Sequence, residues 1–399
     1  MTPLPPSSEN NTSPGTRDRP RRLIVGGAAL RGNGYPNAWN TLRILRNADI
    51  EVMDLCYWLP EEFHLWKLTK LPRWQAAVAL SRLAVRNAKS ALKILVHTRR
   101  NDLVYIPYPG ALLLWLLSWV PRGLRPRCIC DAYITIWDTI YQDRGLGGTR
   151  GGWLSNLVLR FESRALKCAD GLIVDTSKNA DHVAATFNVE RHRIHALPLA
   201  MPEDITTDMG MVHSRRKDAP IRVLFFGTFV PLQGTTKIAQ AIELLRDRTN
   251  LEFLLIGDGQ AAEAAETYLT NHPRVKWLRT WMALHDIKRH IVESDICLGV
   301  FGGRDKAARV LPLKIYIALA AGKPIVTQEF YSLPEGCPPI PAHTVHATAV
   351  DIANGILSLA EHSQLRSELG KKARSYYIQH LGEASITSSW KDILSTMEA

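Results

Sequence analysis

Apolar segments with strand character alternate with helical segments along most of the chain, and this alternation constrains the fold more than any other feature. It begins at residues 21–30, breaks off at 198–220 and starts again at 221–227. Strands that alternate with helices form mostly parallel sheets whose two faces are covered by the helices. Because the pattern occurs twice, and 399 residues suit two cores better than one, we predict two α/β domains with Rossmann-like parallel sheets.

The domain boundaries follow from two stretches that lack hydrophobic periodicity. Residues 1–20 are rich in Pro, Ser, Asn and Thr and contain no apolar core, so we expect no secretory signal peptide there. Residues 198–220 combine Pro, Gly and mixed charge, which is typical of a linker. We therefore expect a disordered tail at 1–20, a first domain at 21–200, a linker at 201–220, a second domain at 221–375 and a C-terminal helix at 376–399.

Two glycine-rich turns follow strands of the second domain, GTFVPLQG at 227–234 and GDGQ at 257–260. Ligands of open parallel sheets bind where strands end, and two facing domains would form a cleft there. Glycine lets the backbone approach a phosphate closely, and a helix N-terminus attracts negative charge. Neither turn carries the full G-x-G-x-x-G pattern, so plain tight turns remain the alternative.

Four basic residues surround the start of a later helix in the second domain. A strand at 296–300 ends in a Gly-Gly loop, and Pro312 then opens a helix. The basic residues around it are Arg304, Lys306, Arg309 and Lys314. Cations near a helix N-terminus can hold a diphosphate. A solvated loop is the other interpretation.

Acidic residues follow a strand of the first domain. Asp131 lies at the carboxyl end of the strand expected at 127–132. Asp138 and Asp143 follow, with Arg144 beside Asp143. A carboxylate at the end of a strand could bind or polarise a sugar hydroxyl. The alternatives are a helix cap or turn residue, with Arg144 simply pairing with one of the carboxylates.

The first half of the chain carries the whole net positive charge. Residues 1–200 hold 27 Lys and Arg against 16 Asp and Glu, whereas residues 201–399 hold 22 of each. Arg82, Arg86, Lys89 and Lys93 are spaced for one face of a helix, and Val78, Val85, Leu92 and Leu95 lie on another. This pattern suits an anionic membrane surface, although a solvated face is the alternative. Nucleic acid is disfavoured because no nucleic-acid-binding motif accompanies the charge.

Cysteine and histidine spacing gives no sign of a metal. The six cysteines form no C-x-x-C pair, and the thirteen histidines show no ligand spacing. We expect a reduced cytosolic protein without a metal site.

Several motifs, in order, resemble family 4 glycosyltransferases of the GT-B fold, and most closely bacterial members with a GTF-P-L-x-G donor loop. In the second half these are GTFVPLQG, LLIGDGQ and ESDICLGVFGGRDKAARVLPLKIYIALAAGKPIVT. In the first half VYIPYPG at 104–110, CDAYITIWDTIYQDR at 130–144 and the segment 165–199 are similar to the acceptor domain. The resemblance covers about residues 21–395.

The resemblance implies a metal-independent, usually retaining transfer of a sugar from a nucleotide-sugar, which is a co-substrate, so that no cofactor is expected. Catalysis would be mostly positioning and electrostatics, without the acid/base pair of glycosidases. It also implies that the last helical stretch, 384–397, crosses back onto the first domain. The implied donor-site residues are Gly227, Thr228, Gly234, Gly257, Gly259, Lys306, Arg309, Pro312 and Lys314. The implied acceptor-side and catalytic residues are Asp131, Asp138, Asp143 and Arg144, with Gly32 and Gly34 in the loop after the first strand.

Four positions depart from the family pattern. Thr228 and Gln233 stand where an Arg and a Lys are common in the first donor loop, and Leu313 replaces an Asn. Ile317 occupies the place of a Glu that binds the nucleotide ribose, and an isoleucine cannot accept a hydroxyl hydrogen bond. These departures leave open which nucleotide is held.

The resulting hypothesis is a hexosyltransferase-type enzyme of cell-envelope or exopolysaccharide biosynthesis. We expect it to act on a glycan or lipid-linked acceptor while bound peripherally to the inner face of the cytoplasmic membrane. The alternatives are a catalytically silent GT-B protein that binds a ligand or partner, and a sugar-nucleotide epimerase on the same fold.

Overall fold

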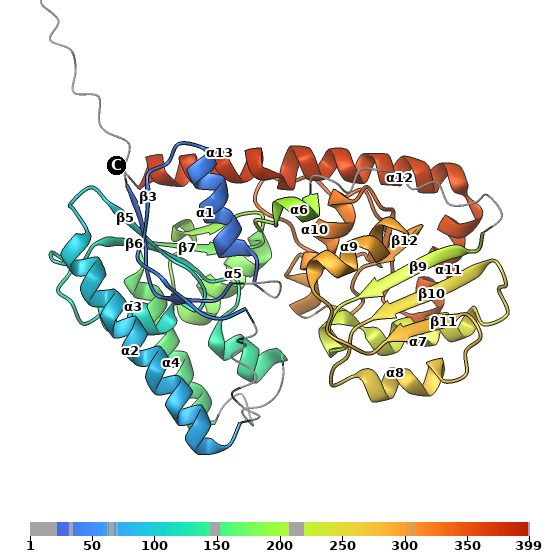
Figure 1. The fold of residues 1–399 in the computed structure, drawn as a ribbon, viewed down its shortest axis with the longest axis horizontal. Coiled ribbons are helices and arrows are strands. Elements are labelled where there is room, and N and C mark those ends of the chain that lie inside the picture. The colour runs from blue at the N-terminus through green and yellow to red at the C-terminus, as the bar shows by residue number, and fades with distance from the viewer. Residues whose placement is uncertain are drawn as a thin grey trace, which may run out of the picture.

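The structure consists of two α/β domains that lie side by side, each built on a six-stranded sheet (Figure 1). The structure is a computed structural model that describes residues 22–31, 35–61, 63, 68, 71–143, 152–206, 219–304 and 306–397. Neighbouring strands in both sheets pair in parallel. The predicted fold class, two parallel-sheet α/β domains, is therefore confirmed.

The first domain has the strand order β3-β1-β5-β6-β7-β8. Its strands are β1 (Leu23–Val25), β3 (Val52–Asp54), β5 (Leu103–Ile106), β6 (Arg127–Asp131), β7 (Gly171–Val174) and β8 (Ile194–Ala196), and a short pair is formed by β2 (Ala28–Ala29) and β4 (Tyr57–Trp58). Its helices are α1 (Asn37–Asn47), α2 (Arg73–His97), α3 (Ala111–Leu117), α4 (Trp153–Cys168) and α5 (Ser177–Phe187), and Asp138–Asp143 forms a π-helical turn.

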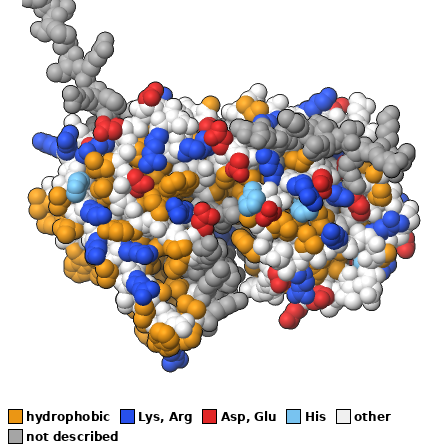
Figure 2. Space-filling view, in the orientation of Figure 1, with side chains coloured by type: hydrophobic (Ala, Val, Ile, Leu, Met, Phe, Trp, Pro, Cys, Tyr) orange, Lys and Arg blue, Asp and Glu red, His pale blue; other side chains and the backbone are white. Residues whose placement is uncertain are grey.

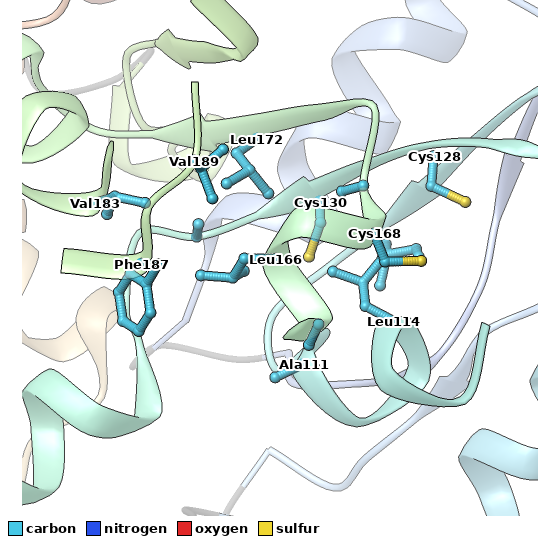
Figure 3. Close-up of a cluster of buried hydrophobic side chains, with 14 of the residues drawn as sticks. Ala111, Leu114, Cys128, Cys130, Leu166, Cys168, Leu172, Val183, Phe187 and Val189 are labelled. Carbon is cyan, nitrogen blue, oxygen red and sulfur yellow. The ribbon is translucent and has the colours of Figure 1, made fainter. Parts of the chain in front are cut away.

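Side chains of the central strands alternate between two hydrophobic clusters, one on each face of this sheet. Val104 and Ile106 join the cluster under α3 and α4, whereas Leu103 and Tyr105 point to the other face. Figure 3 shows the first cluster, in which the sulfur atoms of Cys130 and Cys168 lie among leucine side chains. All six cysteines are free thiols, and those of this cluster serve as core side chains.

The second domain has the strand order β11-β10-β9-β12-β13-β14. Its strands are β9 (Ile221–Phe226), β10 (Leu251–Ile256), β11 (Val275–Leu278), β12 (Ile296–Leu298), β13 (Ile325–Gln328) and β14 (His343–Val345). Its helices are α7 (Thr235–Leu244), α8 (Ala262–Leu269), α9 (Leu284–Val292), α10 (Leu313–Ala320), α11 (Ala349–Glu361) and α12 (Ser363–Tyr376). Most of β9 and β10 is buried, as expected for strands covered on both faces.

The chain end joins the two domains along one side of the molecule. After α12 and the π-helical turn Tyr377–Leu381, helix α13 (Glu383–Thr396) runs along the first domain (Figure 1). Ile386, Trp390 and Ile393 enter the first domain's core, and the Trp390 ring meets Tyr105 edge-on with ring centres 5.0 Å apart. Glu383 also forms an ion pair with Arg43 of α1.

The expected linker at 201–220 is only partly described. Residues 207–218 lie outside the described residues, but Glu203–Thr206 forms the short helix α6. Met201 and Ile205 are buried in the second domain's core. The chain thus already packs against the second domain from residue 201.

Helix α4 begins at Trp153, and apolar side chains in its first turns are exposed to solvent. Within the described part of the chain, no helix combines the length and apolarity that crossing a bilayer would need.

Replacing Trp390 by Ala tests how much α13 contributes to the first domain. The side chain is 2% exposed, so we expect the substitution to lower the free energy of unfolding by about 3 to 5 kcal/mol, measured by urea denaturation. Trp281→Ala is the matched control because that side chain is 61% exposed. Equal midpoints for the two variants would contradict the packing role of α13.

Candidate active site

The two glycine-rich turns of the second domain pack against each other through their backbones. Gly227 follows β9 with φ +140°, and Gly257 follows β10 with φ +129°. A Cβ on Gly257 would lie 2.0 Å from the Gly227 carbonyl oxygen, and one on Gly259 would lie 2.5 Å from the Phe229 carbonyl oxygen. Glycine is required at these places for backbone packing, which also brings both turns to the same edge of the sheet.

The first turn leads directly into the N-terminus of α7. Gly234 precedes this helix with φ +68°, and a Cβ there would lie 2.5 Å from the Phe301 carbonyl. Beside it, Gln233 Oε1 and Thr235 Oγ1 are buried and have no hydrogen-bond partner within the part of the chain that the structure describes. Helix N-termini carry unsatisfied N–H groups and favour anions. Thr228 lies half-buried in the same turn.

Lys314 reaches from α10 to the underside of the first turn. Pro312 caps this helix, and the Lys314 side chain is only 6% exposed. Its Nζ lies 3.6 Å from the centre of the Phe225 ring and would be 3.2 Å from a Cβ on Gly227. Among the described residues, Nζ has no hydrogen-bond partner, and burial lowers the pKa of this amine well below its usual value.

The Arg309 side chain contacts residues of the first domain. Its Nη1 lies 3.7 Å from Asp138 Oδ2 and 3.4 Å from Asn179 Oδ1, and its carbonyl oxygen accepts a hydrogen bond from the Thr176 hydroxyl. Lys306, in a short 3-10 turn, adds positive charge near Asp138. The structure therefore brings these two basic residues to an acceptor-side carboxylate, whereas Lys314 lies at the glycine turn.

Asp138 is a buried carboxylate surrounded by positive and polar groups. Both of its oxygens lie 3.0 Å from His182 Nε2. Burial alone would raise its pKa, but the His182 hydrogen bond and the charges of Arg309 and Lys306 hold the pKa below the ordinary value. Asp138 therefore remains ionised at neutral pH.

Sequence reasoning missed Asp175, which follows β7. Its Oδ1 accepts a 2.8 Å hydrogen bond from Asn179 Nδ2, and its Oδ2 accepts one of 3.4 Å from the Leu311 backbone N–H in the second domain. Burial raises its pKa to about 6. The signal was available, since an Asp directly after an apolar strand is the same pattern that singled out Asp131. The missed partners on α5, Asn179 and His182, have no such signal.

Asp131 lies at the end of β6, inside the first domain. Its Oδ2 accepts a 2.7 Å hydrogen bond from the Tyr105 hydroxyl. Burial raises its pKa to about 7, although the Tyr105 hydrogen bond opposes the shift. It also lines a small pocket with Tyr108, Thr135 and Glu162. A carboxyl group that titrates near neutral pH can hold or release a proton during a reaction.

Four of the predicted site residues lie wholly or partly outside the described part of the chain. The backbone of Asp143 belongs to the π-helical turn, but its side chain lies outside the description. Arg144, Gly32 and Gly34 lie outside the described residues.

Ile317 is a core residue of the second domain. It is 1% exposed and belongs to the hydrophobic cluster that includes Leu224 and Phe226. Leu313, one turn earlier, is partly buried against the same cluster. Of the four departures from the family pattern, these two therefore have a packing role.

The basic residues of α2 lie on the first domain's surface. Arg82, Lys89 and Lys93 are exposed and Arg86 is half-buried. Lys93 Nζ lies 4.6 Å from the centre of the Tyr57 ring. Figure 2 shows Lys and Arg side chains interspersed with hydrophobic ones over the region where Figure 1 places α2.

Solved structures share this architecture at low sequence identity. Anabaena HepE in complex with UDP superposes with a TM-score of 0.59 at 14% identity, covering 94% of this chain and 100% of that chain. Sucrose-phosphate synthase of Thermosynechococcus elongatus gives a TM-score of 0.64 at 14% identity, with 95% and 99% covered. Staphylococcus aureus TarM gives 0.52 at 14% identity, with 76% and 58% covered. The fold is that of GT-B glycosyltransferases.

Family models match both domains. Residues 35–200 match the Glycosyl transferase 4-like domain, and residues 220–362 match Glycosyl transferases group 1. The chain therefore belongs to the group 1 glycosyltransferases, and it is a glycosyltransferase enzyme. No curated protein sequence matches it significantly.

Asp138 and Arg309 should be energetically coupled across the two domains. We expect Asp138→Asn and Arg309→Gln each to lower the free energy of unfolding, because each removes one charge from the largely buried Asp138–Arg309 ion pair. The double variant should cost less than both effects added, by about 0.5 to 3 kcal/mol, in urea denaturation. Strict additivity would contradict the coupling.

Asp131 should make stability depend on pH. Its folded pKa is about 7, whereas the unfolded value is about 3.9. The folded state thus binds the proton more tightly, and this stabilising effect, complete at low pH, is lost as pH rises from about 4 to 7. We expect the stability of Asp131→Asn relative to the wild type to rise by up to about 1.4 kcal/mol per pH unit across that range, measured by urea denaturation. Parallel curves would contradict the raised pKa.

Proposed function

We propose that this chain is a retaining, metal-independent glycosyltransferase that moves a sugar from a nucleotide-sugar to a glycan or lipid-linked acceptor. The observation that carries the proposal is the Lys314 amine, which is buried beneath the Gly227 turn without a hydrogen-bond partner among the described residues. Burying an amine without a hydrogen-bond partner is unfavourable, so such a group favours the binding of an anion. The turn that begins at Gly227 leads to the N-terminal end of α7, where backbone N–H groups would add to the attraction.

A diphosphate fits this arrangement. Its negative charge would pair with Lys314, while the glycine turns allow the backbone to approach. HepE has been solved with UDP and with UDP-glucose, and TarM with UDP, which supports a uridine diphosphate donor as the first to test. The nucleotide-sugar is a co-substrate, and we propose that no further cofactor takes part. The motif order also supports membership of the bacterial subgroup with a GTF-P-L-x-G loop.

The two described carboxylates would have different roles. Asp131, with its pKa near 7, is suited to bind or polarise the acceptor hydroxyl. Asp138 stays ionised and is held by His182 and Arg309, so it would position the donor-side loop 306–312. The leaving diphosphate would be stabilised by Lys314 and the backbone, and the acceptor would attack from the same face. Asp143 and Arg144 remain acceptor-side candidates on sequence grounds.

We further propose that the enzyme works at the inner face of the cytoplasmic membrane in cell-envelope or exopolysaccharide biosynthesis. The support is the basic stripe of α2 on the acceptor domain, defined as Arg82, Arg86, Lys89 and Lys93, of which Arg86 is half-buried and the others are exposed. Each such charge near an anionic surface contributes roughly 1 kcal/mol to binding. A lipid-linked acceptor would be presented at that surface.

Calorimetry with UDP-, GDP-, ADP- and dTDP-linked sugars tests the donor site. We expect one nucleotide class to bind, and Lys314→Met to weaken its affinity about tenfold or more, because an ionic hydrogen bond to phosphate is lost. The same variant should unfold at an equal or higher temperature, since it removes an unpaired buried amine. That result would separate a binding defect from misfolding.

Lys372→Met is the matched control, because Lys372 is exposed on α12. Unchanged affinity in Lys314→Met would remove this residue from the site. Product analysis separates the alternatives: transfer to an acceptor supports the proposal, whereas conversion of the donor alone would indicate an epimerase. Binding without turnover would indicate a catalytically silent GT-B protein.

A further inference from the structure

Helix α2 packs on the first domain through a partly polar face. Its buried residues are Leu83, Asn87, Ser90 and Ile94. Ser90 Oγ accepts a 2.7 Å hydrogen bond from the Gly27 N–H, and Asn87 Oδ1 accepts one of 3.4 Å from the Ala28 N–H. The domain therefore holds this helix by side-chain hydrogen bonds to the β1–β2 backbone as well as by apolar contacts.

The opposite face of α2 is apolar and exposed. At 3.6 residues per turn, this face forms one row about half a turn away from the buried residues. We call it the exposed apolar stripe. Its members, with exposed fractions, are Trp74 (68%), Val78 (42%), Val85 (53%), Leu92 (65%) and Val96 (70%). A soluble amphipathic helix normally buries such a face against its own core; here the apolar residues that the sequence marked as one face of α2 are left in solvent.

The first turns of α2 extend beyond the domain core. From Leu71 to Arg82 the structure buries no residue of this helix or its lead-in, although the sequence there reads LPRWQAAVALSR. In Figure 1 this end of α2 projects at the lower tip of the first domain, and in Figure 2 hydrophobic side chains dominate the same tip. Large exposed apolar surfaces of this kind mark a binding face.

The positive charge beside the exposed apolar stripe indicates what kind of surface covers it. The basic stripe of α2 runs beside the exposed apolar stripe, and no Asp or Glu occurs between residues 73 and 97. A second copy of the chain docked through this helix would bring cations together without acidic partners. An anionic lipid surface instead supplies the opposite charge next to an apolar interior.

Other apolar side chains lie on helices that cover the same face of the sheet. Residues of α2, α3 and α4 share one core cluster, and α3 contacts both of the others. On α4, Trp153 is 79% exposed, Leu154 45% and Leu157 56%. The apolar surface is thus a property of this helical layer and is not confined to α2.

We propose that α2 lies in the plane of an anionic bilayer, with its exposed apolar stripe inserted at the boundary between head groups and acyl chains. The inference rests on the membrane location proposed above and adds insertion to electrostatic attraction. It fixes the orientation of the first domain, whose helical layer would face the lipid.

Co-sedimentation with vesicles tests insertion. The probes are vesicles with about 30 mol% phosphatidylglycerol and vesicles of phosphatidylcholine alone. We expect the double variant Val85→Ser/Leu92→Ser to bind anionic vesicles about tenfold more weakly than the wild type, because apolar burial is lost. The matched control is Leu244→Ser/Val350→Ser, whose side chains are 59% and 58% exposed on the second domain; its binding should be unchanged.

Fluorescence gives the depth of insertion. Acyl-chain-brominated lipids should quench the wild type, and Trp74→Ser should lose part of that quenching, whereas Trp281→Ser on the second domain should lose none. Equal vesicle binding by wild type and Val85→Ser/Leu92→Ser would overturn insertion. So would a wild-type dimer in light scattering that this variant abolishes, because the stripe would then bind a second copy.

Two further measurements separate this inference from the proposed function. Arg82→Gln/Lys89→Gln should weaken vesicle binding at low salt and reduce its salt dependence; if only this variant weakens binding, the membrane location stands and insertion fails. Nucleotide-sugar affinity in solution should be equal in all these variants, since none lies near Lys314. A loss of donor binding alone would concern the donor site and leave the lipid contact intact.

Discussion

The contact between loop 306–312 and the start of α5 is the constraint on which the candidate site depends. Thr176 binds the Arg309 carbonyl, Asp175 binds the Leu311 N–H, and the Arg309 side chain meets Asp138. Leu311 is followed at once by Pro312, the N-cap residue of α10. The first domain therefore holds the segment that delivers Lys314 to the Gly227 turn, so that the acceptor side and the donor side are linked through one loop.

A second connection between the domains is made by the end of the chain. Helix α13 returns from the second domain and buries Trp390 in the core of the first. Additional backbone hydrogen bonds join the domains at Ser177 and Glu335. With both connections, the relative position of the two sheets, and hence of Asp131 and Lys314, is set by packing as well as by the polar contacts.

The fold was predictable from the sequence because strand and helix periodicity are local properties. The motif order also led to the correct family and to an enzyme. Pairings across the domains were harder to foresee: Arg309 was assigned to the donor phosphates because of its spacing, yet only the folded chain shows that Asp138 and Asn179 lie within its reach. The contact of His182 with Asp138 is likewise visible only in the folded chain, because the spacing of histidines along the sequence gives no sign of it. The exposure of the apolar face of α2 was also unpredictable, because periodicity shows that a face is apolar but not which face the core covers.

The central claim is that the Lys314 amine binds the diphosphate of the nucleotide-sugar. Because burial lowers its pKa and an anion would raise it again, nucleotide-sugar binding should take up a proton. Titration calorimetry measures that uptake directly. The enthalpy of nucleotide-sugar binding is compared between buffers of different ionisation enthalpy, from about pH 6 to 10. The account predicts proton uptake in the wild type that disappears in Lys314→Met. Binding without any proton uptake across the range, or uptake that persists in the variant, would contradict it.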